Sequence, residues 1–171
     1  GDHNTIREHC SLHRGTVQDQ SLTKIGSHNL LMVNTHIAHD CVVGSHNIMA
    51  NNVGVAGHVH VGDYVILGGN SGIHQFCKIG SYSMVGAASL IVKDVPAYVM
   101  ASGNPAHAFA MNFEGMRRKG WSKDVIQALR EAFKLVYKAG LTKEQALEKI
   151  RTDLLPQHAE VALFVDSIEQ S

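Results

Sequence analysis

Three side chains in the segment NTHIAHDC, residues 34–41, are of types that move protons or bind metals. His36 and His39 stand three residues apart, and Asp40 follows the second histidine. An imidazole exchanges a proton near neutral pH, and a neighbouring carboxylate fixes its tautomer and stabilises its protonated form. Imidazoles and carboxylates also bind metal ions. The segment therefore indicates acid–base chemistry or a metal site, and the choice depends on how the chain positions it.

The chain around this segment has a six-residue repeat. Every sixth residue from Ile25 to Ile91 is aliphatic, and the residue four places after each of them is compact. A helix has a period near 3.6 residues, whereas a short strand followed by a turn fits a period of six. Glycines recur every 18 residues, at Gly26, Gly44, Gly62 and Gly80. Three hexads per 18-residue coil predict a parallel β-helix of triangular section over residues 1–96, with glycine at its tight turns.

Two features near the start of the chain bear on the extent of this β-helix. The register continues backwards through Leu12 and Ile6, and the polar segment of residues 18–24 is expected to be a loop pushed out of a coil. The first residues enter in the middle of a hexad, without the capping turn that a solenoid needs at its end. We therefore expect N-terminal coils to be missing from the chain.

Residues 97–171 lack the repeat, and they predict a connector followed by a small α-helical domain. A turn is indicated where Asn104 meets Pro105. Capping residues and apolar periodicity predict three helices: one from Ser122 to Gly140, one that begins with a capping box of Thr142 and Gln145 and stops before Pro156, and one over residues 158–168.

The 18-residue coil converts sequence spacing into spatial neighbourhood, because residues 18 apart stack at about 4.8 Å, the spacing of paired strands. One polar strip is predicted to cross three coils, and it contains His39, Asp40, Gly57, His58, His74 and Gln75, with His36 across the preceding turn. A separate column of stacked rings is expected at an exposed turn position, from His9, His28, His46, Tyr64 and Tyr82.

The strip favours acyl transfer to an alcohol. His39 can take a proton from a hydroxyl, Asp40 can orient it, and the unshielded N–H of Gly57 can stabilise a developing oxyanion. The strip holds no obvious serine or cysteine nucleophile, so direct attack by a substrate hydroxyl is favoured over a covalent intermediate. Two alternatives stay open: a metal site formed by His36, His39 and His58, with or without a neighbouring subunit, and a scaffold without catalysis.

The composition excludes some classes of partner. Lys plus Arg equals Asp plus Glu, at 15 each, so no global field favours nucleic acid or a membrane surface. We find no signal peptide or spanning segment, which makes a cytoplasmic protein the expectation. An odd, sparse set of cysteines suits buried filler better than disulfides: Cys10, Cys41 and Cys77.

Several motifs resemble one family. The segments IREHCSLHRGTV, NLLMVNTHIAHDCVVG, VAGHVHVGD, GIHQFCKIG, DVPAYVMASGNPA and NFEGMRRKG occur in this order and span nearly the whole chain. They resemble the left-handed β-helix acyltransferases and, more narrowly, the UDP-N-acetylglucosamine O-acyltransferases, which catalyse the first step of lipid A biosynthesis. The resemblance implies a left-handed solenoid and transfer of a 3-hydroxyacyl group from acyl carrier protein to the 3-hydroxyl of UDP-N-acetylglucosamine.

The resemblance also implies roles for individual residues. His39 matches the general base, Asp40 its orienting partner, and the Gly57 N–H the oxyanion donor. Positions that line the substrate cleft are matched by His13, His36, His58, His74 and Gln75, and positions that hold the nucleotide sugar by Asn112, Glu114 and Arg118. No metal and no cofactor are expected, since the acyl group arrives on its carrier protein.

The family implies further partners. It works as a homotrimer with sites between neighbouring subunits, so a homotrimer is expected here. The basic turn of residues 117–119 is a candidate dock for the acidic carrier protein. The small residues at positions 86–88 suggest room for a long acyl chain rather than a short one.

Rival functions come from three classes. The related N-acyltransferase, which modifies an amine later in the same pathway, shares the predicted fold but fewer of the motifs. A β-helix carbonic anhydrase would hold zinc with three histidines between subunits. A non-enzymatic scaffold predicts that replacing His39 changes nothing beyond stability.

Overall fold

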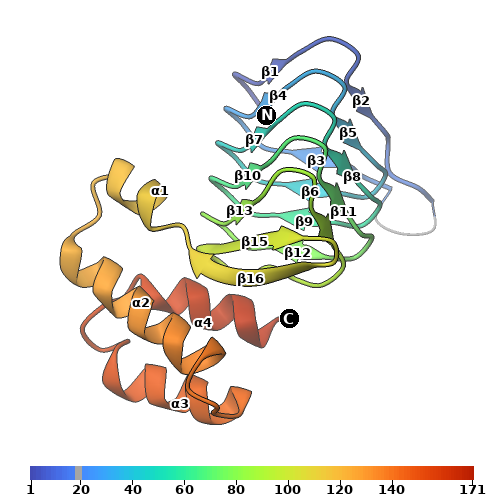
Figure 1. Ribbon diagram of the computed structural model, residues 1–171. Helices are drawn as coiled ribbons and strands as arrows, with labels where there is room; N and C mark the ends of the chain where they lie inside the picture. Colours follow the sequence, from blue (N-terminus) through green and yellow to red (C-terminus); the bar gives the residue numbers. More distant parts are fainter. Residues whose placement is uncertain (18–20) are drawn as a thin grey trace.

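The computed structural model describes residues 1–17 and 21–171, and it shows a prism of stacked coils with a group of helices packed at one end (Figure 1). Each coil contributes one two-residue strand to each face of the prism, and strands of successive coils pair in parallel. The predicted parallel β-helix with a helical C-terminal part is confirmed.

Three sheets form the faces. The first contains β1 (Thr5–Ile6), β4 (Leu30–Leu31), β7 (Ile48–Met49), β10 (Ile66–Leu67), β13 (Met84–Val85), β15 (Val99–Gly103) and β16 (Ala106–Met111). The second contains β2 (Ser11–Leu12), β5 (His36–Ile37), β8 (Gly54–Val55), β11 (Gly72–Ile73) and β14 (Leu90–Ile91). The third contains β3 (Lys24–Ile25), β6 (Val42–Val43), β9 (His60–Val61) and β12 (Lys78–Ile79).

The repeat explains both the short strands and the core. The second residue of each strand points into the prism, so Leu31, Ile37 and Val43 of one coil are buried together. The compact residue two places before the next aliphatic one also lies inside, as Thr35 and Cys41 do. The coils from β4 to β14 repeat this buried set and form one continuous apolar core along the axis, whereas Ile6 and Leu12 of the first coil are exposed.

Two asparagines inside the solenoid join successive coils at the corner after the third sheet. The side chain of Asn29 accepts a hydrogen bond from the Asn47 N–H at 2.8 Å and donates one to the Gly44 carbonyl at 3.0 Å. Asn47 repeats the first of these bonds by accepting from the Val65 N–H at 2.7 Å, but among the described residues its side-chain nitrogen has no acceptor. These amides satisfy backbone groups that the turn leaves without partners in its strand ladder.

Replacing Asn29 with alanine is expected to lower the free energy of unfolding by about 2–3 kcal/mol, because one buried and one partly buried backbone group lose their partner. Denaturant unfolding of the variant and the wild type measures the difference. Asn51→Ala is the matched control, since Asn51 is exposed at a corner and should change stability by less than about 0.5 kcal/mol. An equal loss in both variants would contradict a specific role for the inner amide.

The glycines at the corner after the third sheet are required for a different reason from the one predicted. At Gly26 and Gly44 the backbone does not take a positive φ; the positive φ falls two residues later, at His28 (60°) and His46 (61°). Glycine is required there because a Cβ at Gly26 would lie 2.5 Å from the Gly44 carbonyl oxygen of the next coil. Close stacking of coils, and not a left-handed backbone, therefore selects glycine.

The ring column exists, but its membership differs from the prediction. Rings stack with centroids 4.6–5.5 Å apart in the order His3, His28, His46, Tyr64, Tyr82 and Tyr98. His3 takes the place predicted for His9, because the inserted segment before Lys24 makes the first coil step 25 residues rather than 18, as the pairing of Thr5 with Leu30 shows. The column is also not wholly solvated, since Tyr98 is buried.

The predicted loop of residues 18–24 is described only in part. Residues 18–20 lie outside the described residues. On either side, Thr16 and Thr23 return to the corner after the second sheet, where both contact Asp40.

The chain after residue 96 contains more regular structure than the sequence predicted. The predicted turn at Asn104-Pro105 is confirmed, and it joins β15 and β16 in an antiparallel hairpin whose first strand extends the first sheet. The helices are α1 (Phe113–Arg118), α2 (Lys123–Tyr137), α3 (Lys143–Asp153) and α4 (Val161–Glu169). The caps at Ser122 and Thr142 are confirmed, whereas α1 and the hairpin strands were not predicted.

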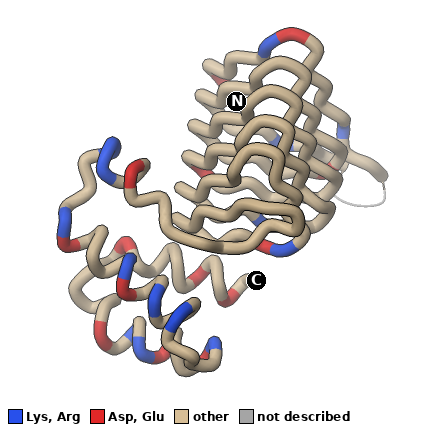
Figure 2. The backbone as a smooth tube through the Cα atoms, in the orientation of Figure 1, with Lys and Arg blue, Asp and Glu red and all other residues tan. Residues whose placement is uncertain are grey.

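Charge is unevenly distributed. Lys, Arg, Asp and Glu gather on the helices and at the ends of the solenoid, while its middle coils are almost free of them (Figure 2). Between residues 25 and 77 only Asp40 and Asp63 carry a formal charge. Asp40 is therefore a rare charge in an apolar scaffold.

Within the described residues, no helix is long and apolar enough to cross a membrane.

Candidate active site

The polar strip lies at the corner between the second and third sheets. Strand β5 ends there at Ile37, and the turn that follows carries His39 and Asp40. The next coil places Gly57 and His58 beside them, and the coil after that adds Gln75. Backbone hydrogen bonds fix this register: His58 N–H donates to the His39 carbonyl at 3.1 Å, and Phe76 N–H donates to the Gly57 carbonyl at 3.2 Å. The stacking predicted from the 18-residue spacing is confirmed.

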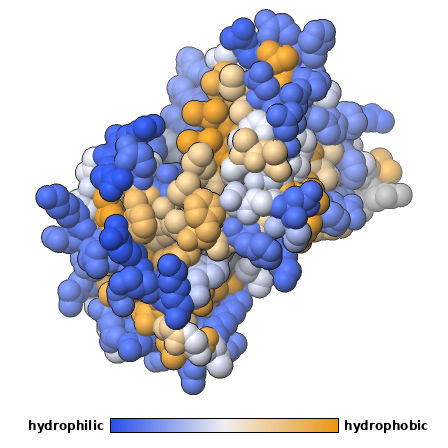
Figure 3. Space-filling model, in the orientation of Figure 1, coloured by the Kyte–Doolittle hydropathy of each residue, from blue (hydrophilic) through white to orange (hydrophobic). Residues whose placement is uncertain are grey.

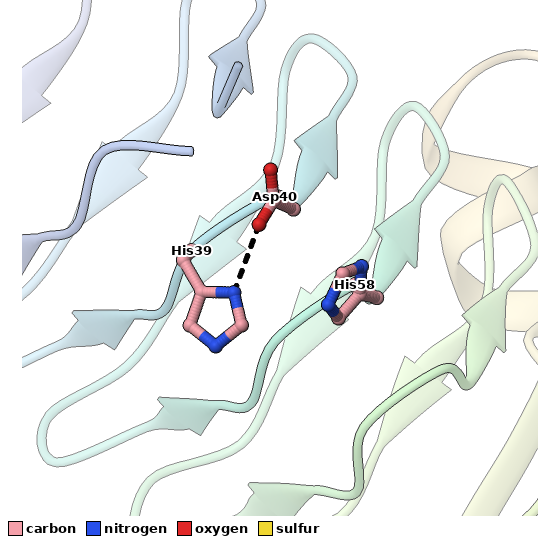
Figure 4. Close-up of side chains that lie close together, drawn as sticks. All are labelled: His39, Asp40 and His58. Carbon is pink, nitrogen blue, oxygen red and sulfur yellow. Dashed lines mark hydrogen bonds and ion pairs between the residues drawn. The ribbon is translucent and has the colours of Figure 1, made fainter. Parts of the chain in front are cut away.

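His39 and Asp40 form a hydrogen-bonded pair at the start of this strip (Figure 4). The His39 Nδ1 lies 2.9 Å from the Asp40 Oδ2. The Asp40 side chain is 1% exposed and the His39 side chain 41% exposed, so the carboxylate is inside and the ring reaches solvent. With the Nδ1 proton directed at the carboxylate, the Nε2 is left to accept a proton from a substrate.

Asp40 is held as a carboxylate by its neighbours. Burial is the largest single influence and raises the pKa of Asp40, but hydrogen bonds from Thr16 and His39 outweigh it and lower the pKa below its ordinary value. Thr16 donates its hydroxyl to Oδ2 at 2.7 Å and its N–H to both oxygens at 3.0 Å. Thr16 was missed by sequence reasoning, because it lies 24 residues from Asp40 and outside the 18-residue register.

Gly57 lies directly against the His39 ring. A Cβ at this position would be 2.8 Å from the ring Cε1 and 2.9 Å from Nε2, closer than real contacts allow. In the part of the chain that the structure describes, the Gly57 N–H donates to no backbone or side-chain acceptor. The residue packed against the ring therefore has a backbone N–H without a protein acceptor, which is the kind of group that an oxyanion site requires.

His36 forms a second histidine centre on the adjoining face. Its Nδ1 is 2.8 Å from the Ser11 hydroxyl, and its ring meets the His13 ring edge to face at 4.7 Å. Burial lowers the pKa of His36, and the nearby His13 lowers it further, so both effects favour the neutral ring. Ser11 was also missed, because it is 25 residues from His36 across the inserted segment.

Three further cleft candidates flank the pair. The His58 ring meets His39 edge to face at 5.1 Å and stacks on Phe76 at 4.7 Å. His74 and Gln75 are exposed on the third coil, where the His74 Nδ1 lies 3.1 Å from the Gln75 carbonyl oxygen. All three line the same corner as His39, as the sequence predicted.

Helix α1 holds the three residues expected to bind a nucleotide sugar. Asn112 caps it by accepting from the Gly115 N–H at 3.0 Å, and its amide donates to the Tyr82 carbonyl at 3.1 Å. Glu114 pairs with both Arg117 and Arg118 on the exposed side of the helix. The hydrogen bond from Arg117 is the main cause that lowers the pKa of Glu114.

Lys119, directly after α1, contacts the ring column. The Lys119 Nζ lies 3.5 Å from the centroid of the Tyr64 ring, a cation–π contact at the corner after the third sheet. His39 lies at the corner after the second sheet, so one chain does not bring Asn112, Glu114 and Arg118 to the histidine pair. The docking role of the basic turn stays a prediction, with two of its cations already paired to Glu114.

A cluster of possible metal ligands coincides with the pair. Ligand atoms of His39, Asp40 and His58 all lie within 4.8 Å of one another. However, the Asp40 carboxylate already accepts hydrogen bonds from Thr16 and His39, and the His39 Nδ1 is engaged with it. A metal ion there would have to displace this network, whereas proton transfer at the free Nε2 uses it as it stands.

Comparisons with known proteins agree with this architecture. The six repeats of the bacterial transferase hexapeptide match residues 22–57, which places the solenoid among the hexapeptide-repeat transferases. The second domain of UDP-N-acetylglucosamine O-acyltransferase matches residues 94–171. The chain belongs to the UDP-N-acetylglucosamine O-acyltransferase family.

Individual relatives give the extent of the similarity. An acyl-[acyl-carrier-protein]–UDP-N-acetylglucosamine O-acyltransferase of Psychrobacter cryohalolentis is 71% identical over all of this chain and 66% of its own length. The solved structure of LpxA from Acinetobacter baumannii has a TM-score of 0.96 and 76% identity, over 99% of this chain and 66% of that one. The Arabidopsis UDP-N-acetylglucosamine acyltransferase has a TM-score of 0.94 and 40% identity, over 100% of this chain and 61% of that one. The chain thus spans about two thirds of the length of the curated relatives it matches.

Proposed function

We propose that the protein transfers a 3-hydroxyacyl group from acyl carrier protein to the 3-hydroxyl of UDP-N-acetylglucosamine, the first step of lipid A biosynthesis. The observation that carries the proposal is the His39–Asp40 pair, with the ring Nε2 open to a substrate and the Gly57 backbone against the ring. The names of the relatives support the choice of substrates. The proposal places the reaction in the cytoplasm.

The mechanism follows from the positions of these groups. His39 Nε2 takes the proton of the sugar hydroxyl as its oxygen attacks the thioester carbonyl, and Asp40 stabilises the imidazolium that forms. The Gly57 N–H donates to the oxyanion of the tetrahedral intermediate. The carbon–sulfur bond then breaks, and the imidazolium returns its proton to the leaving thiolate of the carrier protein. Every proton is accounted for without a metal or cofactor.

A second copy of the chain is part of the proposal, as a homotrimer with sites between subunits. Two observations support it. The residues expected to hold the nucleotide lie at a different corner from His39, so a neighbouring chain would supply one of the two groups. The outward residues of β4, β7, β10 and β13 in the first sheet are also apolar: Leu30, Ile48, Ile66 and Met84. Figure 3 shows apolar side chains gathered over the coils. An apolar stripe of this kind is typical of a contact surface.

The test uses the protein expressed from its complete reading frame. Light scattering first measures the particle mass, for which three chains are expected. The protein is then incubated with UDP-N-acetylglucosamine and 3-hydroxyacyl carrier proteins of several chain lengths, and mass spectrometry follows the mono-acylated sugar nucleotide. An ester product that forms with and without a chelator is expected.

Two other outcomes would favour rival functions. An acylated amine, formed only when the acceptor is a 3-O-acylated glucosamine nucleotide, would indicate the related N-acyltransferase. Bound zinc at about one ion per chain, with carbon dioxide hydration and no acyl transfer, would indicate the β-helix carbonic anhydrase.

A further inference from the structure

The residues on both sides of the inserted segment contact the catalytic carboxylate. Thr16, before it, gives Asp40 three hydrogen-bond contacts, from its hydroxyl at 2.7 Å and from its N–H at 3.0 Å to each oxygen. Thr23, after it, accepts the Asp40 N–H at 2.9 Å through its hydroxyl. Asp40 itself has a positive φ of 58°. One residue is therefore held at its backbone and at its carboxylate by two threonines from outside the regular coil.

The contacts of the Asp40 Oδ2 atom indicate how Thr16 acts on the His39–Asp40 pair. Asp40 Oδ2 lies 2.7 Å from the Thr16 hydroxyl and 2.9 Å from the His39 Nδ1. A carboxylate bound only to His39 would be free to rotate and to present either oxygen. The bonds from Thr16 hold both oxygens, so the carboxylate plane is fixed against the imidazole.

We propose that Thr16 is a positioning residue for acyl transfer: its hydroxyl and N–H hold the Asp40 carboxylate in the orientation that sets the tautomer and direction of His39. Thr16 touches no reacting atom and acts through Asp40. This inference rests on the proposed function, because it gives Thr16 a role in that reaction.

The main variant is Thr16→Val, which keeps the shape and the backbone N–H but removes the hydroxyl. We expect kcat to fall about tenfold with KM unchanged, because a misdirected base weakens the chemical step and not substrate binding. Thr16→Ser restores the hydroxyl and should restore kcat. The matched control is Thr35→Val, which removes an inward hydroxyl that donates to the Met32 carbonyl at 2.8 Å, at the corner before β5 and not at the corner that holds Asp40. It should lower stability without changing kcat of the folded enzyme.

A double-mutant comparison separates positioning from a general structural role. In an Asp40→Ala background, Thr16→Val should cause no further loss of kcat, since the group it positions is gone. A loss of the same factor in both backgrounds would show that Thr16 supports the fold or another group, and it would overturn the proposal.

A second readout does not depend on activity. NMR titration of the Asp40 carboxyl carbon should show that the carboxyl ionises at higher pH in Thr16→Val than in the wild type, because the carboxylate has lost a donor. Thr35→Val should leave the titration unchanged. If Thr16→Val also leaves it unchanged, the proposal fails whatever the enzyme does. If the wild type transfers no acyl group but the titration moves, the proposed function fails and the contact with Asp40 stands.

Discussion

Replacing His39 with alanine is expected to lower kcat by about 10²–10⁴-fold, the usual contribution of a general base. The variant loses the ring nitrogen that lies against Gly57, together with the ring's hydrogen bond to the Asp40 carboxylate. KM for the sugar nucleotide should change little, because the ring acts on the hydroxyl proton. Steady-state assays with acyl carrier protein as donor measure both constants.

The fold should survive this change. The His39 side chain is partly exposed and fills no core position, so thermal unfolding of the variant should match the wild type. His60→Ala is the matched control, since His60 is an exposed histidine on β9, outside the strip, and it should keep full turnover. An His39→Ala enzyme with wild-type kcat would show that the strip is a scaffold and that the base lies elsewhere.

Replacing Gly57 with alanine is expected to be nearly as damaging, with a loss of about 10²–10³-fold in kcat/KM. The added methyl group would sit 2.8 Å from the His39 Cε1 and 2.9 Å from Nε2, so the ring must move. A ring that moves away from the Gly57 backbone separates the base from the donor of the oxyanion. The added methyl group would therefore impair both proton transfer by His39 and stabilisation of the oxyanion by the Gly57 N–H.

Gly54→Ala is the control for this prediction, because a Cβ at Gly54 meets no atom within 4 Å. That variant should fold and turn over like the wild type. A crystal structure of Gly57→Ala should show the His39 ring displaced. Full activity in Gly57→Ala would mean that the ring and this amide do not enclose the reacting carbonyl, and the oxyanion donor would have to be sought elsewhere.

Much of this site could be predicted from the sequence, because a solenoid converts fixed spacing into contact. His39, Gly57 and Gln75 are 18 residues apart in turn, and their stacking needed only a constant coil length. Asp40 could also be singled out from the sequence, because it is a charged residue next to a histidine in an otherwise uncharged stretch. The expected core residues follow from the same periodicity.

What was missed has one main physical cause. The insertion before Lys24 changes the first coil step to 25 residues, so the contacts of Ser11 with His36 and of Thr16 with Asp40 fall outside any 18-residue comparison. The same change of step put His9 in the ring column where His3 belongs. Contacts between coils can be predicted from residue spacing only where the coil length is constant.

Helix α1 was missed for a different reason. It has six residues, and its two apolar residues, Phe113 and Met116, are too few to establish a helical period. It is held by tertiary contacts, including the Asn112 bond to the Tyr82 carbonyl and the Lys119 contact with Tyr64. Structure that depends on such contacts is not encoded in local propensity.

The corner that carries the site assigns one chemical task to each of three successive coils. In the proposed mechanism the first coil supplies the base and its carboxylate and the second supplies the N–H donor, while the third presents the exposed His74 and Gln75. Since each coil contacts only its neighbours, it behaves as a replaceable module of 18 residues. If the proposed function holds, exchange of the third coil between relatives is expected to alter which substrate is accepted, while the His39–Asp40 pair of the first coil stays unchanged.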